Sequence, residues 1–240
     1  MSDPQPPLDR EQLVAELRER LRGLEGAPRT AENLQYSTGC NSLDRLLPAG
    51  GLVRGTLVEW LAAGEGSGAA RLALTAACQA CRDHGPLIVI DGEGSFYPPA
   101  AVAAGIAAER LFVVRAPQSR DEAWALDQTL RSAGVGAVFC SSPRLSSSTL
   151  RRLQLAAESS GAAGMLVRPA AVRDEPCWAE ARLLVQPLAG AGGRRLRVEL
   201  VRARAATAGE SVELEFDDET GALHLVAELA PAAAVWRPGA

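Results

Sequence analysis

The sequence predicts an α/β protein with a mostly parallel sheet flanked by helices, antiparallel strands added at the C-terminal end, and a linked N-terminal helix. Three observations support this fold class. Up to residue 168, short apolar runs alternate with runs of helical periodicity, which is typical of parallel strands joined by helical crossovers. Beyond residue 180, strand-like runs are joined by glycine-containing turns. An amphipathic run over residues 9–24 precedes both patterns.

Composition limits the protein classes to which the chain can belong. The 240 residues are 47% hydrophobic and carry a formal net charge of -4, which suits one large domain and excludes a global basic field for DNA binding. No run of about eighteen apolar residues appears, and Met1 is not followed by a signal peptide pattern. We therefore expect a cytoplasmic protein without membrane contact. The five cysteines, an odd number, predict no disulfide framework.

Four segments are expected along the chain. Residues 1–26 hold a proline-rich leader and an amphipathic helix, residues 27–35 are a linker, and residues 36–226 form the core domain. Residues 227–240, which are rich in alanine and proline, are expected to be a disordered tail.

The N-terminal helix is predicted from leucines that repeat at intervals of three and four residues, while charged residues cover its other sides. Such a stripe packs either on the chain's own core or on a partner, and the sequence leaves both open. The candidate partner contacts are Leu13, Leu17 and Leu21.

The core begins with a strand, a glycine loop and a helix within residues 58–74. Further strands are predicted from apolar runs, and further helices from 3.6-residue periodicity. The expected strands are 86–91, 111–114, 136–142 and 164–168, and the expected helices end near 105, 131 and 159. The antiparallel strands are expected at 181–186, 194–204, 211–216 and 222–226.

The glycine loop has the architecture of a phosphate-binding loop. Its three alternate glycines are Gly64, Gly66 and Gly68. A working loop continues with lysine and then serine or threonine, because the lysine reaches the phosphates and the hydroxyl holds Mg²⁺. Here Ala69 and Ala70 occupy those positions.

No other side chain is expected to replace the missing lysine. All 25 basic residues of the chain are arginines. The nearest, Arg71, lies about 200° further round the helix than Ala69 and is expected to point away from the phosphates. We therefore predict no nucleotide cofactor, no metal and no ATPase activity. The glycine amides leave weak sulfate or phosphate binding open.

Motifs on both sides of the loop are specific. Those before it are Ser37-Thr38-Gly39, Ser42-Leu43-Asp44, Gly50-Gly51-Leu52 and Gly55. This series resembles the segment that precedes the phosphate loop in RecA-type recombinases. By the same resemblance, Glu93 matches the glutamate that activates water, and Ser141 stands where an aspartate supports Mg²⁺. The site has therefore lost a second group, and Glu93 is interpreted as a relic or a structural acid.

Over residues 36–226 the pattern is similar to the ImuA branch of RecA-like proteins, which is also labelled as SulA-like cell-division inhibitors. This resemblance implies an accessory role in SOS-induced translesion mutagenesis and DNA repair. The implied partners are RecA, a Y-family-like ImuB-type protein and an error-prone polymerase subunit. We expect a non-catalytic adaptor that is monomeric or weakly self-associating. The alternatives are a weak ATPase that uses Glu93 and a partner's cation, and a cell-division inhibitor.

Direct DNA binding is expected to be weak. The connections after residues 141 and 169, where RecA has its DNA-binding loops, are short or modest. Strand alternation predicts Arg195 and Arg197 on one face and Arg202 and Arg204 on the other, so the basic cluster is not one stripe. Arg195 and Arg197 are candidate weak DNA contacts, although a solvated, charged strand edge is the favoured interpretation.

Overall fold

The computed structural model describes residues 34–141, 145–189, 194–204, 208–217 and 223–229. The described elements belong to one compact unit, residues 35–240. The helix predicted over residues 9–24, with its leucine stripe, and residues 230–240 lie outside the described part. No helix in the described part is both long and apolar enough to cross a membrane.

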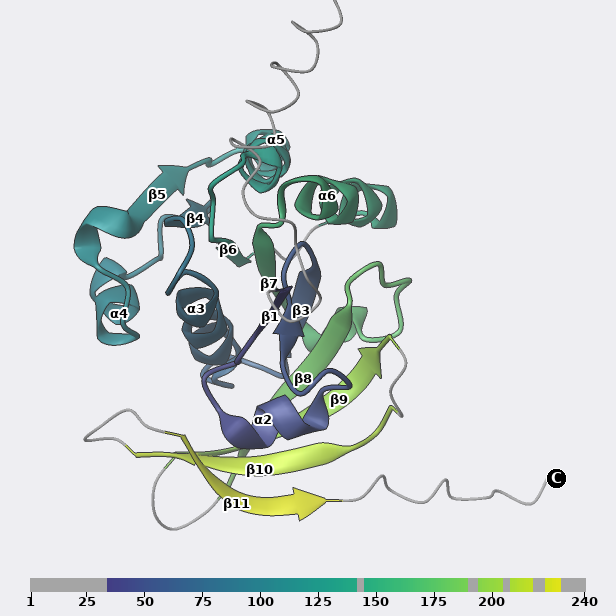
Figure 1. Cartoon of the computed structure of the whole chain (residues 1–240). Coiled ribbons are helices and arrows are strands. Elements are labelled where there is room, and N and C mark those ends of the chain that lie inside the picture. The colour runs from purple at the N-terminus through teal and green to yellow at the C-terminus, as the bar shows by residue number, and fades with distance from the viewer. Residues whose placement is uncertain (1–33, 142–144, 190–193, 205–207, 218–222, 230–240) are drawn as a thin grey trace, which may run out of the picture. The chain divides into compact units, whose positions relative to one another are not determined.

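A nine-stranded sheet runs through this unit, in the order β11-β10-β9-β8-β3-β7-β6-β4-β5 (Figure 1). Its parallel strands are β3 (Leu57–Ala62), β4 (Leu87–Asp91), β5 (Leu111–Arg115), β6 (Ala137–Ser141), β7 (Ala163–Pro169) and β8 (Ala181–Leu188). Its antiparallel strands are β9 (Arg194–Ala203), β10 (Ser211–Phe216) and β11 (Leu223–Leu229). The predicted sheet, its flanking helices and the added antiparallel strands are confirmed, while the linked N-terminal helix lies outside the described residues. β11 also takes in residues 227–229, which the sequence assigns to the tail.

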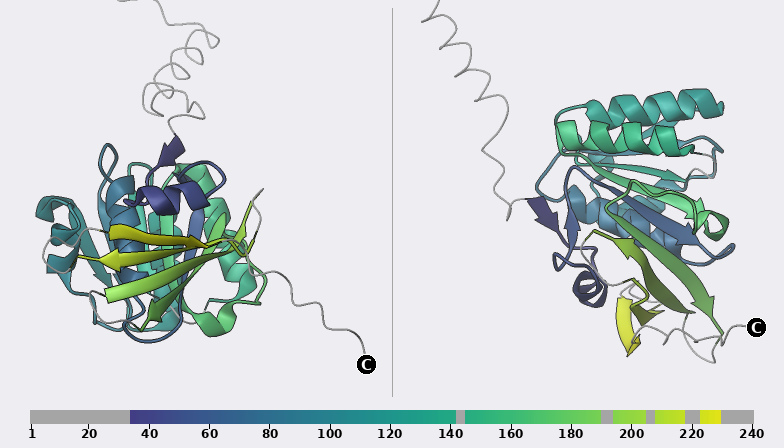
Figure 2. Two further views of the ribbon diagram at one scale, coloured as in Figure 1. Left: turned by 90° about the horizontal axis from the view of Figure 1, so that it is seen from below. Right: turned by 90° about the vertical axis from the view of Figure 1, so that its right-hand side faces the viewer.

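Helices cover both faces of the parallel part (Figure 2). One face buries α3 (Ala69–Ala80), and the other buries α5 (Ser119–Arg131) and α6 (Ser147–Ser160). A short helix, α4 (Pro98–Ala103), and the 3-10 turn η2 (Ala108–Arg110) join β4 to β5. The two faces form two separate apolar clusters, as expected for a sheet with helices on both sides.

The remaining elements frame this sheet. A small antiparallel pair, β1 (Gln35–Tyr36) and β2 (Leu52–Val53), flanks α2 (Asn41–Leu46), and the 3-10 turn η3 (Ala170–Val172) follows β7. Local sequence explains how α6 begins and ends. The Ser146 hydroxyl accepts a hydrogen bond from the Thr149 amide at 3.2 Å, and Gly161 ends the helix in the left-handed region at φ 84°.

The predicted placement of the β9 arginines on two faces is wrong. Arg195 and Arg197 pair with Leu188 and Gln186 of β8, and Arg202 pairs with Arg182. Residues 182, 186 and 188 share one face of β8, so their partners share it too. A register shift between Arg182 and Leu183 inserts an extra residue into β9 and reverses the alternation. Arg195, Arg197 and Arg202 therefore share one face of the strand.

Candidate functional site

The glycine loop connects β3 to α3 and lies next to the antiparallel strands β9 and β10. Gly66 and Gly68 have φ values of 70° and 90°, a backbone region that glycine adopts without strain. A Cβ atom on Gly68 would lie 3.0 Å from Leu196 of β9 and 3.4 Å from Phe216 of β10. The loop is therefore packed against the chain's own C-terminal strands.

Polar groups of the loop already have partners within the protein. The Ser67 amide donates to the Gly64 carbonyl oxygen at 3.3 Å, and the Ala69 amide donates to the Ser67 hydroxyl at 3.4 Å. The Arg194 guanidinium donates to the Gly66 carbonyl oxygen. A phosphate bound through these two amides would have to displace their present contacts, because phosphate loops bind their anion through such amides.

The first turn of α3 offers a phosphate neither an ammonium nor a hydroxyl group. Ala69 is buried and Ala70 is exposed. The Arg71 guanidinium carbon lies 4.4 Å from the ring centroid of Phe216, a cation–π contact with β10.

The acids near the loop have different environments. Asp91 at the end of β4 is buried, and its carboxylate accepts hydrogen bonds from the amides of Ser95 at 3.0 Å and Phe96 at 3.4 Å. Asp91 therefore holds the following turn. Glu93 is exposed and has no hydrogen bond or ion pair with any residue that the structure describes.

A cavity of about 720 Å³ lies beside the loop, between α3, α4 and the carboxyl ends of β4 and β6. Ala70, Glu93 and Ser141 all line it, so the structure brings together three residues that the sequence singled out. Most of its wall is apolar, however, including Leu74 and Phe139. The three loop glycines do not line this cavity.

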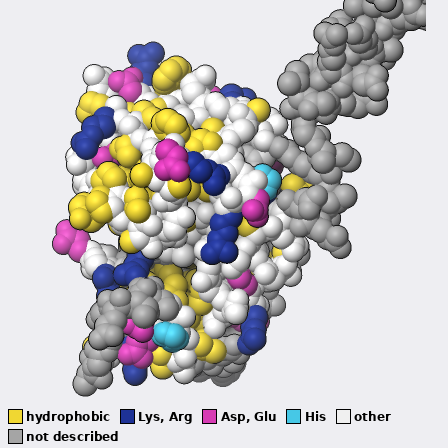
Figure 3. All heavy atoms as spheres, turned by 60° about the vertical axis from the view of Figure 1, so that its left-hand side comes forward, with side chains coloured by type: hydrophobic (Ala, Val, Ile, Leu, Met, Phe, Trp, Pro, Cys, Tyr) yellow, Lys and Arg dark blue, Asp and Glu magenta, His cyan; other side chains and the backbone are white. Residues whose placement is uncertain are grey.

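Exposed apolar side chains lie on the face formed by α4, β5 and α5. The exposed fractions of Tyr97, Phe112 and Trp124 are 69%, 52% and 64%. Figure 3 shows hydrophobic side chains gathered on this side of the molecule. β5 ends the sheet, so this face has an open strand edge in the described structure.

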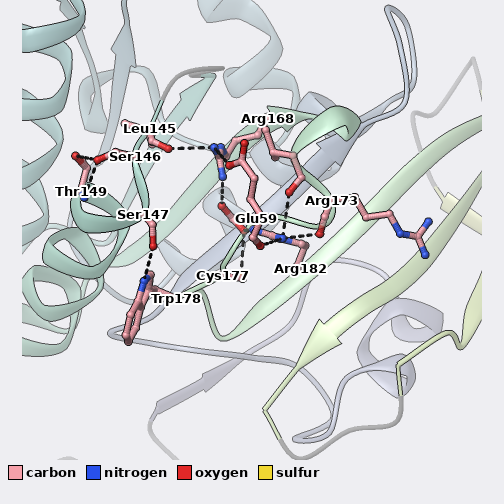
Figure 4. Close-up of polar contacts among 12 residues, drawn as sticks. Glu59, Leu145, Ser146, Ser147, Thr149, Arg168, Arg173, Cys177, Trp178 and Arg182 are labelled. Atoms are coloured by element: carbon pink, nitrogen blue, oxygen red, sulfur yellow. Dashed lines mark hydrogen bonds and ion pairs between the residues drawn. The ribbon is translucent and has the colours of Figure 1, made fainter.

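A buried polar network around Glu59 of β3 was not predicted from the sequence (Figure 4). Glu59, Arg168 and Arg182 have side chains at most 2% exposed. Arg168 Nη1 lies 2.8 Å from Glu59 Oε1, and Arg182 Nη2 lies 2.6 Å from Glu59 Oε2. The sequence did contain a signal for this network, namely an acid inside an apolar strand and arginines at positions 168 and 182. A buried charge requires a partner, so these residues could have been expected to pair.

This network ties two loops to the sheet. Arg168 also donates to the Leu145 carbonyl oxygen at 3.1 Å, before α6. Arg182 donates to the carbonyl oxygens of Arg173 at 2.7 Å and Glu175 at 2.8 Å, after β7. The described parts of the connections that follow β6 and β7 are therefore anchored to β3.

The candidate DNA contacts are engaged in ion pairs along the β9–β10 ladder. Arg197 lies 2.7 Å from Glu213, and Arg195 lies 3.4 Å from Glu215. Each arginine side chain is 39% exposed. Carboxylates this close offset the positive charge that a phosphate would contact.

Comparisons with known proteins agree with this architecture. The family model of the RecA N-terminal domain matches residues 24–158. The chain is 36% identical over 99 residues to the RecA proteins of Chlorobaculum tepidum and Bartonella bacilliformis. Each match covers 41% of this chain, and the chain spans only 28% of either relative's length. The crystal structure of the RadB recombinase has a similar fold, with a TM-score of 0.60 and 18% identity over 77% of this chain and 97% of that one.

Proposed function

Since the chain belongs to the RecA N-terminal domain family, we propose that it is a non-catalytic accessory protein of DNA repair. In this role it binds RecA and the mutagenic polymerase complex of damage-induced translesion synthesis. The resemblance of residues 36–226 to the ImuA branch supports these partners.

The glycine loop is the observation that carries the non-catalytic role. Ala69 and Ala70 stand where a working loop has its lysine and hydroxyl, and the amides of Ser67 and Ala69 donate within the protein. Removing one partner of a buried, hydrogen-bonded charge pair costs about 2–5 kcal/mol. Because about 1.4 kcal/mol is tenfold in affinity, a micromolar nucleotide site would become millimolar or weaker.

A weak ATPase is the competing function, and one contact favours it. Arg194 of β9 reaches the Gly66 carbonyl, so a cation lies at the rim of the loop even though the chain has no lysine. Glu93 is exposed at the neighbouring cavity, where it could orient water. Hydrolysis measurements separate the two functions.

We expect phosphate release at saturating ATP to be no faster than in buffer, with or without single-stranded DNA. The missing lysine and the apolar cavity wall are the physical reasons. Glu93→Gln should change nothing, and Glu109→Gln, an exposed acid outside the cavity, is its matched control. A turnover above about 1 per minute, slow beside typical enzymes, would support the ATPase if Glu93→Gln alone abolished it.

The adaptor role requires a direct complex. The exposed apolar face of α4, β5 and α5 supports it, because large exposed apolar patches mark interaction sites. Interferometry between the full chain and immobilised RecA should give saturable binding. Absence of binding at about 10 μM RecA, where even a micromolar complex would form, would contradict the proposed partner.

A further inference from the structure

We infer that the cavity beside the glycine loop binds a bulky apolar side chain followed by a basic residue, presented by a segment of a partner protein. This inference rests on the proposed function, because the cavity can bind such a ligand only when no nucleotide occupies the site. The apolar wall, the charges and the surface around the mouth each support this ligand.

The wall of the cavity suits an aromatic or large aliphatic group. The rings of Phe96 and Phe139 lie with their centroids 6.0 Å apart, and Leu74 and Val89 add buried aliphatic surface. On the α4 side, Ala103 leaves the space open because its side chain is small. A volume of about 720 Å³ exceeds the needs of one side chain and leaves room for its neighbour.

The charges at the cavity favour a cation over a phosphate. Asp91 and Glu93 both line the cavity. The Asp91 carboxylate lies 3.9 Å from the guanidinium group of Arg115, whose side chain is largely exposed. Arg71 is the one cation among the described residues of the wall, and its guanidinium stacks on Phe216, which does not line the cavity. A polyphosphate would face the exposed Glu93 carboxylate, whereas an arginine or lysine of a partner would face complementary charge.

The surroundings of the mouth indicate a chain segment rather than a small molecule. Tyr97 lines the cavity and is mostly exposed. Val102 of α4, next to the cavity-lining Ala103, is about half exposed. An extended segment could cover this surface while one side chain enters the cavity, the arrangement in which a buried anchor carries most of the binding energy and the surrounding contacts exclude water.

The probe is the acetylated and amidated dipeptide Phe-Arg, titrated into the ¹⁵N-labelled full chain and followed by NMR. We expect saturable shifts of the amide signals of Phe96, Tyr97 and α4. The dipeptides Ala-Arg, without the ring, and Phe-Glu, with the opposite charge, should each bind about tenfold more weakly, since each removes one of the two interactions.

Two variants test the site within the chain. Ala103→Trp should fill the cavity and abolish Phe-Arg binding, while Ala133→Trp, at an exposed position outside the cavity, should leave binding unchanged. Glu93→Gln should weaken the binding of Phe-Arg several-fold and should not weaken the binding of Phe-Glu. Glu109→Gln should leave the affinity for both dipeptides unchanged. Both test positions are exposed, and circular dichroism verifies that each variant is folded.

The outcomes separate the cavity ligand from the adaptor role. Equal binding of the three dipeptides, or unchanged Phe-Arg affinity in folded Ala103→Trp, would overturn the ligand even if the chain still bound RecA. Phe-Arg binding in the expected pattern without a RecA complex would support the cavity and contradict the proposed partner. ATP that displaced Phe-Arg at micromolar concentration would overturn both.

Discussion

Among single residues, Glu59 is the acid on which the buried polar contacts of β3 converge. It is fully buried between Arg168 and Arg182, and Cys177 Sγ lies 3.1 Å from its Oε2 atom. Neither arginine can reach solvent, so loss of the carboxylate would leave two buried positive charges without their main counter-ion. Such a network is costly to break even where its net contribution to stability is modest.

We expect Glu59→Gln to lower the free energy of unfolding by about 3–5 kcal/mol, because it leaves buried charges uncompensated. Urea unfolding followed by circular dichroism measures this change. The matched control is Glu213→Gln, which breaks the half-exposed pair with Arg197 and should cost no more than about 1 kcal/mol. A loss below about 1 kcal/mol in Glu59→Gln would show that the network is not a stabilising anchor.

The thiols of Cys78 in α3 and of Cys81, which caps the end of that helix, predict how stability depends on pH. Burial raises the pKa of Cys78 to about 11, and burial together with the nearby Cys78 raises that of Cys81 to about 12, from an ordinary 9.0. The folded chain therefore holds these protons more tightly than the unfolded chain. Their contribution to stability is fully present below pH 9.0 and is lost as the pH rises towards 12.

Urea unfolding near pH 8 and near pH 10.5 checks this sign, because these values lie on either side of the ordinary thiol pKa. The free energy of unfolding should fall between them, and it should fall less in the double variant Cys78→Ala, Cys81→Ala. Burial also raises the pKa of Tyr36, but that residue is present in both proteins and cancels in the difference. Equal losses in the two proteins would contradict the assignment to the thiols.

At the scale of elements, the N-terminal amphipathic run is a second partner surface proposed from the sequence. In the RecA-type recombinases that the sequence resembles, an N-terminal helix on a linker is expected to pack against the neighbouring protomer, and we propose that this chain docks on RecA as a false neighbour. Burying each leucine of the stripe should contribute about 1.5–3 kcal/mol to binding. Replacing Leu13, Leu17 and Leu21 with serine should abolish RecA binding in interferometry and leave the core folded.

The matched control replaces Glu16 and Glu19, on the polar side of the same run, with serine and should leave RecA affinity unchanged. Two results of the triple leucine variant would contradict the false-neighbour proposal. One is unchanged RecA affinity. The other is unfolding of the core, which would mean that the stripe packs on its own domain.

At the scale of the whole molecule, charge opposes tight DNA binding. The net charge is -4, and the two candidate arginines of β9 pair with glutamates of β10. Fluorescence anisotropy with a single-stranded oligonucleotide should give dissociation constants above about 10⁻⁶ M at physiological salt, the non-specific range. Arg195→Ala with Arg197→Ala should change little. Tight binding that this double variant abolished would instead make the ladder a DNA site.

Local sequence patterns predicted the order of strands and helices along the chain, the change from a parallel to an antiparallel sheet, and the altered phosphate loop. These features are local, because periodicity and turn residues within a short window set them. The sequence also identified Ala70, Glu93 and Ser141, which line one cavity. These positions were predictable because the carboxyl ends of parallel strands and the start of the following helix meet at one edge of the sheet.

Contacts between side chains that are distant in the sequence depend on how the folded chain packs. The extra residue in β9 places Arg195 and Arg202 on one face, and Arg194 reaches the glycine loop from 128 positions away in the chain. Glu59 finds its arginines 109 and 123 positions further along. Strand register and packing between segments far apart in sequence set these contacts, and no local pattern encodes them because a single inserted residue reverses every face that follows.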